Sequence, residues 1–277
     1  MKTSLCLTGA LAATLCAGAA KPNFVIIMAD DMGYNATSAY GGWLKTPHLD
    51  RMAREGMRFT DYHSSGVVCS PTRAGLLTGR YQERAGVPSV INADPKVPDH
   101  HRGLWPSEQT FPKLLAKAGY ASALFGKWHL GYKKKFNPMH HGFAAFRGFI
   151  SGNIDYLSHY DRMEVYDWWD GLDTVVEEGY STRLITKHAL RFIDQNKARP
   201  FCLYVAHEAM RYGPWKFVAG NKGGLFNLDD DPGESMNLAK RYPARAKRMA
   251  AALEAWKRDV ANGATPQPDH AAASRNR

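Results

Sequence analysis

One cysteine of this sequence lies in a polar stretch where a turn is expected. In the segment GVVCSPTRAGLLTGR, Cys69 precedes Ser70 and Pro71, which suit the cap and the first position of a helix. A helix N-terminus attracts anions through its free backbone N–H groups and stabilises the thiolate form of a cysteine. Arg73, one turn into this helix, can point back at a tetrahedral oxyanion. The segment therefore predicts an anion-binding position that holds a reactive thiol.

Two adjacent carboxylates form a second group of residues that could take part in binding or catalysis. Asp30 and Asp31 follow directly on the apolar run FVIIMA at 24–29. Two carboxylates next to each other after a buried strand repel unless a cation or strong hydrogen-bond donors lie between them. The pair favours a hard divalent cation, calcium or magnesium. Two solvated acids in a loop are the alternative that the pair alone leaves open.

Further polar groups follow two other apolar runs in the same manner. Lys127 and His129 lie in GKWHLG, directly after YASALF, and the segment from His207 to Arg211 follows FCLYVA. In open α/β sheets, ligands bind beyond the carboxyl ends of the parallel strands. We therefore expect these side chains to lie near Asp30 at one edge of a sheet. A snorkelling lysine and a strand-end histidine with a purely structural role are the alternatives.

The elements that must hold these groups alternate between strands and helices. The run at 24–29 is apolar at every position, as expected for a parallel strand that is covered on both faces. Further strands are predicted at 120–125 and 201–206. Helical spacing of apolar residues, with Pro at starts and Gly at stops, predicts helices at 46–57, 70–79, 110–119 and 181–196. The chain therefore reads as α/β, without internal repeats.

Composition and charge narrow the class of protein. The 277 residues are 44% hydrophobic, which is enough for one large domain or a domain with a small appendage. The formal net charge of +10 suggests anionic partners, yet the basic residues are spread out. The only dense run, YKKKF at 132–136, reads as a solvated loop rather than a basic stripe for nucleic acid. We expect small anions or polysaccharides as partners, and no nucleic acid.

The first twenty residues, MKTSLCLTGALAATLCAGAA, have the layout of a cleavable signal peptide. The apolar run is too short for a membrane span, so no membrane anchor is expected. A buried N-terminal helix and a lipoprotein anchor at Cys16 are the alternatives. The signal predicts a periplasmic or secreted protein whose remaining cysteines are Cys69 and Cys202. Because Cys202 lies in an apolar strand, we expect no disulfide between them.

Four ordered segments give the sequence a family resemblance. CSPTRAGLLTGR resembles the sulfatase signature Cys-x-Pro-x-Arg with its following Gly-Arg. PNFVIIMADDMGYN, KTPHLDRMAREGMRFTDYH and GYASALFGKWHLG resemble other N-terminal blocks of that family, in the right order over residues 22–131. The resemblance implies an alkaline-phosphatase-like sandwich, with a largely parallel central sheet flanked by helices.

The same resemblance implies the hydrolysis of sulfate esters, with sulfated carbohydrates as one substrate class. In this family a formylglycine-generating enzyme converts the motif cysteine, here Cys69, to formylglycine, whose hydrate attacks sulfur. Arg73 is then expected to steady the hydrate. Asp30 and Asp31, together with the group at position 69, are expected to hold a calcium ion, with magnesium as the alternative.

Two further residues receive roles from the resemblance. Lys127 and His129 are expected to bind the sulfate, to neutralise charge in the transition state and to help the leaving alcohol depart. The family often has a further sulfate-contacting histidine before Tyr and Pro. Here the sequence reads HEAMRYGPW, with Arg211 at that position and His207 nearby. An arginine can bind sulfate through its fork, but it cannot donate a proton as histidine does.

The resemblance also predicts an incomplete fold. The family's long segment after this histidine, with two more metal ligands and a sulfate-binding lysine, is not visible near residues 211–215. Instead, the segment from 215 resembles the family's C-terminal region, with a hairpin and then a basic helix expected at 244–260. The expected organisation is a signal peptide, a partial catalytic domain and a small hairpin-and-helix remnant of the C-terminal subdomain, over 1–20, 21–214 and 215–277.

Three functional hypotheses follow from these observations. The first is an exported sulfatase of low activity, and the second is a catalytically inactive remnant that binds sulfated glycans at most. A phosphoesterase of the wider alkaline-phosphatase-like group is the third, although such an enzyme would more naturally carry Thr or Ser than a Cys-x-Pro-x-Arg element.

Overall fold

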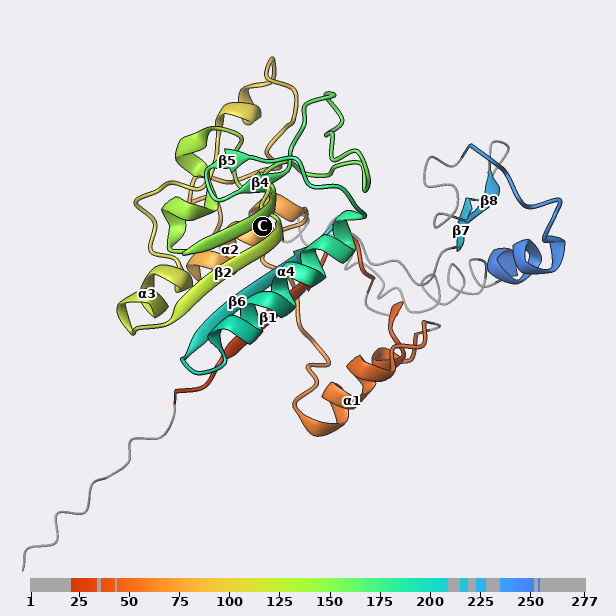
Figure 1. Ribbon diagram of the computed structural model, residues 1–277, viewed down its shortest axis with the longest axis horizontal. Coiled ribbons are helices and arrows are strands. Elements are labelled where there is room, and N and C mark those ends of the chain that lie inside the picture. Colours follow the sequence, from red (N-terminus) through yellow and green to blue (C-terminus); the bar gives the residue numbers. More distant parts are fainter. Residues whose placement is uncertain are drawn as a thin grey trace, which may run out of the picture.

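A mostly parallel sheet of six strands forms the centre of the computed structural model, which describes residues 21–33, 36–42, 44–208, 215–218, 223–227, 235–251 and 254. The strand order is β1-β6-β2-β3-β4-β5 (Figure 1). The first four strands in this order are parallel, and the last two add antiparallel pairs. The strands are β1 (Phe24–Ala29), β2 (Ala121–Lys127), β3 (Ala145–Phe149), β4 (Trp169–Asp170), β5 (Asp173–Thr174) and β6 (Phe201–His207).

Helices flank the sheet, which confirms the predicted α/β class. They are α1 (Pro47–Glu55), α2 (Cys69–Thr78), α3 (Phe111–Lys117), α4 (Ser181–Asn196) and the short 3-10 helices η2 (Ser38–Tyr40), η3 (Pro98–His101), η4 (Lys134–Phe136) and η5 (Pro138–His141). Helix α4 lies along the sheet beside β6 (Figure 1). The lysines of the YKKKF run are exposed on and beside η4, as expected for a solvated segment.

Successive side chains of the central strands point to opposite faces of the sheet, so the hydrophobic core consists of two clusters, one on each face. Phe125 and Leu203 pack with Ile185 of α4 on one face. Leu124 and Tyr204 belong to a second cluster on the other face, which includes Leu77 of α2, Val87 and Trp128. Successive side chains of a strand point to opposite faces, so one strand supplies both clusters. The sheet is thereby fixed between helices α2 and α4.

Strand β1 does not have the environment that its sequence predicts. It pairs in parallel with β6, but it is an edge strand, and Val25 and Ile27 are 49% and 62% exposed. Ile26 and Met28 pack against the core on the opposite face. The expectation that both faces of this strand are covered is therefore wrong. Helix α1 likewise has no buried residue, although an apolar face was predicted for it.

An exposed apolar edge strand is a template for pairing with another chain. We expect the protein to self-associate, and we expect Ile27→Lys to shift it toward the monomer because a charge on the exposed face opposes edge-to-edge pairing. Sedimentation velocity over a concentration series measures the effect. Ile26→Lys is the matched control, since this side chain packs inward and its replacement should unfold the protein. A wild-type chain that stays monomeric at every concentration would contradict the prediction.

The C-terminal part contains the predicted hairpin. Strands β7 (Trp215–Val218) and β8 (Gly224–Asn227) pair in antiparallel fashion, and the Leu225 N–H donates to the side-chain oxygen of Asn237 at 3.1 Å. Residues 243–251 and 254 are helical, beginning one residue before the basic helix predicted at 244–260. The predicted signal at 1–20 lies outside the described residues. Within the described part of the chain, no helix is both long and apolar enough to cross a membrane.

Candidate active site

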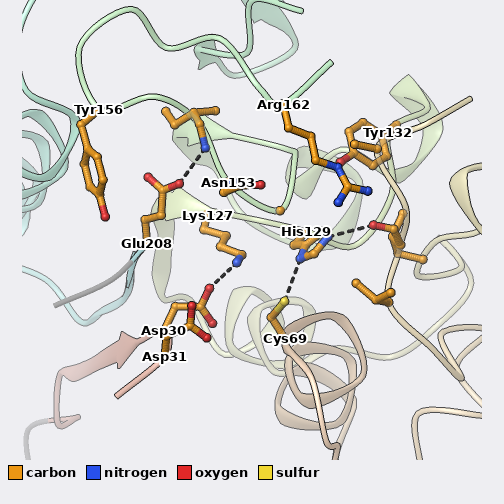
Figure 2. Close-up of a pocket in the computed structure, with 15 residues that line it drawn as sticks. Asp30, Asp31, Cys69, Lys127, His129, Tyr132, Asn153, Tyr156, Arg162 and Glu208 are labelled. Atoms are coloured by element: carbon orange, nitrogen blue, oxygen red, sulfur yellow. Dashed lines mark hydrogen bonds and ion pairs between the residues drawn. The ribbon is translucent and has the colours of Figure 1, made fainter. Parts of the chain in front are cut away.

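The carboxyl ends of β1, β6 and β2 lie side by side and bring the predicted polar residues together. Ala29 is in register with His207, and Gly126 with Ala206, so the residues that follow these strands share one edge of the sheet. A cavity of about 430 Å³ opens there (Figure 2). Its labelled lining residues are Asp30, Asp31, Cys69, Lys127, His129, Tyr132, Asn153, Tyr156, Arg162 and Glu208.

Helix α2 presents Cys69 to this cavity from its first turn. The helix begins at Cys69 itself, after Val68, so the predicted cap role of Ser70 is wrong. The Ser70 hydroxyl instead accepts a hydrogen bond from the Ile91 N–H at 3.0 Å and ties the helix to a distant loop. Pro71 is tolerated because the first-turn N–H groups have no partner inside the helix. As predicted, the helix stops at Gly79, which is left-handed with φ 64.

The thiol of Cys69 faces the imidazole of His129. Cys69 Sγ lies 3.1 Å from His129 Nδ1, and His129 Nε2 lies 2.9 Å from the backbone oxygen of Ile91. A carbonyl oxygen only accepts, so Nε2 carries the proton and the lone pair of Nδ1 points at position 69. Burial, reinforced by the charge of Lys127, lowers the pKa of His129 to about 3, so the ring is neutral at pH 7. His129 also has a left-handed backbone, with φ 55.

Cys69 and Cys202 do not form a disulfide. Both are free cysteines, and Cys202 is buried in β6. This confirms the expectation that Cys69 is an unpaired thiol. Burial raises the pKa of the Cys202 thiol to about 11, which keeps that residue unreactive.

Arg73 lies beneath the site rather than in the first cavity. It is 1% exposed, and Nη1 donates to the backbone oxygen of Lys127 at 2.9 Å and to the Tyr204 hydroxyl at 3.3 Å. Its Nη2 lies 3.7 Å from Asp30 Oδ1. Arg73 lines a second cavity of about 800 Å³, which shares Asp30 and Cys69 with the first. The arginine therefore braces the groups around position 69 and adds positive charge below them.

Asp30 is held by two cationic side chains. The ammonium group of Lys127, 3% exposed, forms a hydrogen-bonded ion pair with Asp30 Oδ2, and Arg73 faces the other carboxylate oxygen. Asp31 follows with a left-handed backbone, φ 53. No cluster of three or more His, Cys, Asp or Glu suited to a metal occurs among the described residues. A calcium ion takes six to eight oxygen ligands, so the described residues do not supply a complete calcium site.

Sequence reasoning missed Glu208, which directly follows β6. Its carboxylate is 7% exposed, lines the first cavity, and accepts a hydrogen bond from the Ile154 N–H through Oε1 at 2.6 Å. Burial raises the pKa of Glu208 to about 7. Counting in steps of two from the buried Tyr204 through Ala206 reaches Glu208, so strand periodicity could have found it.

Arg162 is a site residue that the sequence did not predict, whereas His207 and Arg211 were predicted but are not among the described lining residues. Arg162 lines the cavity from the loops before α4 and donates to Asn92 Oδ1 at 2.7 Å. No sequence pattern places that irregular segment beside the strand ends. His207 is not among the described residues that line the two cavities. Arg211 lies outside the described residues.

A family model described as Sulfatase matches residues 22–219. N-acetylgalactosamine-6-sulfatase of Rattus norvegicus is 36% identical over 253 residues, which cover 81% of this chain and 48% of that protein. N-acetylglucosamine-6-O-sulfatase of Bacteroides thetaiotaomicron is 34% identical over 232 residues, which cover 82% of this chain and 37% of that protein. The chain spans about half the length, or less, of these curated relatives.

Solved structures give the same picture of the fold. One, determined in complex with its substrate D-glucosamine-2-N,6-O-disulfate, aligns with a TM-score of 0.55 at 33% identity and covers 71% of this chain and 36% of its own. The crystal structure of Ps i-CgsB in complex with k-i-k-neocarrahexaose aligns with a TM-score of 0.61 at 27% identity. The alignment covers 86% of this chain and 55% of that one. The present chain therefore corresponds to part of each of these larger folds.

Proposed function

The chain belongs to the sulfatase family, and from this premise we propose that it hydrolyses sulfate esters of carbohydrates at position 69. Its mostly parallel sheet with flanking helices is part of an alkaline-phosphatase-like fold. The observation that carries the proposal is the juxtaposition of Cys69, at the start of α2, with the neutral imidazole of His129 at 3.1 Å. The relatives are named as sulfatases of N-acetylated amino sugars, and one solved structure holds a glucosamine disulfate, which supports a sulfated sugar as substrate.

Formylglycine made from Cys69 by a separate maturating enzyme is part of the proposal, and its hydrate would supply the hydroxyl that attacks sulfur. His129 Nδ1, which carries no proton, is placed to accept the proton of that hydroxyl. The imidazole, once protonated, can pass this proton to the alcohol oxygen as the bond from that oxygen to sulfur breaks, which is the help to the leaving alcohol expected of His129. The second hydroxyl of the hydrate can then collapse to the aldehyde and release sulfate. The Lys127 ammonium group is the nearby positive charge that can neutralise the sulfate oxygens.

Calcium, or magnesium, belongs to the proposal as a weakly bound ion at Asp30 and Asp31. Glu208 lines the same cavity, but the described residues form no metal-binding cluster of three side chains, and Asp30 is already engaged by Lys127 and Arg73. For location, we propose export to the periplasm or the medium through residues 1–20.

A second candidate function is binding of sulfated glycans without turnover. It is favoured by the incomplete set of metal ligands among the described residues. Both candidates use the same cavity, so binding alone does not separate them. Turnover that depends on the residue at position 69 separates the two candidate functions.

The test is hydrolysis of a chromogenic aryl sulfate by the full chain after co-expression with a maturating enzyme. We expect phenol release above that of Cys69→Ala prepared in parallel, because this variant keeps the cavity but has no precursor of the nucleophile. Equal rates for the two proteins, with retained binding of inorganic sulfate, would favour the glycan-binding alternative. Equal rates without any sulfate binding would contradict both candidates.

A further inference from the structure

Glu208 is a buried carboxylate for which the proposed reaction has no role, and we propose that its Oε2 atom binds a hydroxyl group of a sulfated sugar. In this role Glu208 is a specificity residue that favours hydroxyl-bearing sulfate esters over aryl or alkyl sulfates. The inference rests on the proposed function, since it places a sulfate ester in the same cavity.

The hydrogen bonds of Glu208 leave one oxygen available. Oε1 accepts from the Ile154 N–H at 2.6 Å, whereas Oε2 is buried and has no hydrogen-bond partner among the described residues. A buried polar atom without a partner is unfavourable because it has lost its hydrogen bonds to water. The protein retains this cost in the free state, and a ligand that pairs with Oε2 would remove it.

The position of Glu208 places this atom within reach of a bound substrate. The residue lines the same cavity as Cys69, Lys127 and His129. Figure 2 shows it beside Lys127, on the opposite side of Lys127 from His129 and Cys69, with Tyr156 next to it. A sugar whose sulfate lies between Lys127 and position 69 can reach Glu208 with its ring hydroxyls if it extends past Lys127 within this cavity.

The chemistry of Oε2 selects a hydroxyl rather than a second sulfate. A sulfate carries negative charge and only accepts hydrogen bonds, so an ionised carboxylate repels it. A hydroxyl both donates and accepts, and it can therefore pair with the ionised or the protonated acid. Because burial raises the pKa of Glu208 to about 7, both forms are present near neutral pH. Coordination of a cation is disfavoured, since the described residues place no cluster of three metal-binding side chains there.

Glu108 provides a matched control within the same chain. Like Glu208 it is 7% exposed. Both of its carboxylate oxygens, however, accept hydrogen bonds from Arg80 Nη1, at 2.9 and 2.7 Å, and it does not line either cavity of the site. Replacement of Glu108 therefore reports the general cost of removing a buried glutamate, without the proposed contact to a ligand.

The experiment is calorimetric titration of the full chain, with unmodified Cys69, using N-acetylglucosamine 6-sulfate and methyl sulfate as probes. We expect the sugar sulfate to bind roughly tenfold more tightly than methyl sulfate, the effect of one hydrogen bond to a buried acid. Glu208→Leu should lose this difference in affinity. Glu208→Gln should keep most of it, because an amide also donates and accepts hydrogen bonds. Glu108→Leu should lower stability and leave the ratio of affinities as in the wild type.

Each contrary outcome has a distinct meaning. Equal affinity for both probes in the wild type, or an advantage that survives Glu208→Leu, would overturn the role of Glu208 while a sulfate site stands. Binding of neither probe would count against the proposed function and would remove the inference with it. Calcium binding that is lost in Glu208→Gln would assign Oε2 to a cation instead. If Glu208→Leu does not fold, O-methylated N-acetylglucosamine 6-sulfate tests the wild type directly, and it should lose the advantage.

Discussion

With formylglycine at position 69, these 277 residues are expected to hydrolyse an aryl sulfate at least roughly 1000-fold more slowly than a full-length relative. Removing one preorganised donor from an oxyanion site lowers turnover by about 100- to 1000-fold, and more than one group is involved here. The described carboxylates that line the cavity of the nucleophile are Asp30, Asp31 and Glu208, and they form no metal-binding cluster of three, whereas a hard cation takes about six or more oxygen ligands. Lys127 and Arg73 also compete with a cation for Asp30.

Steady-state turnover with calcium titrated in measures this deficit. Only protein in which formylglycine has been demonstrated at position 69 should be compared, so that incomplete maturation is not mistaken for a weak site. The rat enzyme matched above, measured on the same substrate, is a suitable reference. Turnover comparable to that reference, and abolished by Asp30→Ala, would show that other residues complete the metal site.

Replacing Arg73 by alanine is expected to lower the free energy of unfolding by about 3 kcal/mol or more. The guanidinium group is 1% exposed and holds together Lys127, Tyr204 and Asp30. Its removal leaves a buried carbonyl oxygen without its donor, weakens the neutralisation of a carboxylate and opens a cavity under the site.

Urea unfolding of Arg73→Ala and wild type gives this difference, provided that both transitions are two-state. Arg51→Ala is the control, because Arg51 and Glu55 form an exposed pair at 4.0 Å whose contribution is expected to be below about 0.5 kcal/mol. A loss below about 1 kcal/mol for Arg73→Ala would show that solvent or neighbouring side chains replace the arginine.

Much of the fold that positions the site was predictable from apolar runs. The runs at 24–29, 120–125 and 201–206 correspond to β1, β2 and β6, which lie together in the sheet. Strand β3 was missed because its sequence, AFRGF, carries an arginine, and Arg147 forms ion pairs with Asp170 and Glu177 rather than packing in the core. Such a pattern resembles a polar loop.

Two errors arose from information that local sequence does not contain. An all-apolar strand can lie inside a sheet or at its edge, and only the pairing partners show that β1 is at the edge. Ser70 fits a helix cap by its type, yet its hydroxyl bonds to Ile91, a residue in a separate loop. Cys69, Lys127 and His129 were predicted for one edge of the sheet and line one cavity, and strand periodicity could have added Glu208, whereas Arg162 required the tertiary arrangement.

The central claim, that Cys69 is the precursor of the nucleophile, is tested most directly by peptide mass analysis of the chain after co-expression with a formylglycine-generating enzyme. Cys202 serves as an internal control, because it is buried in β6 and has no Cys-x-Pro-x-Arg context. We predict an aldehyde or its hydrate at position 69 and an intact thiol at Cys202. An unmodified thiol at Cys69, under conditions that convert a full-length relative, would contradict the account.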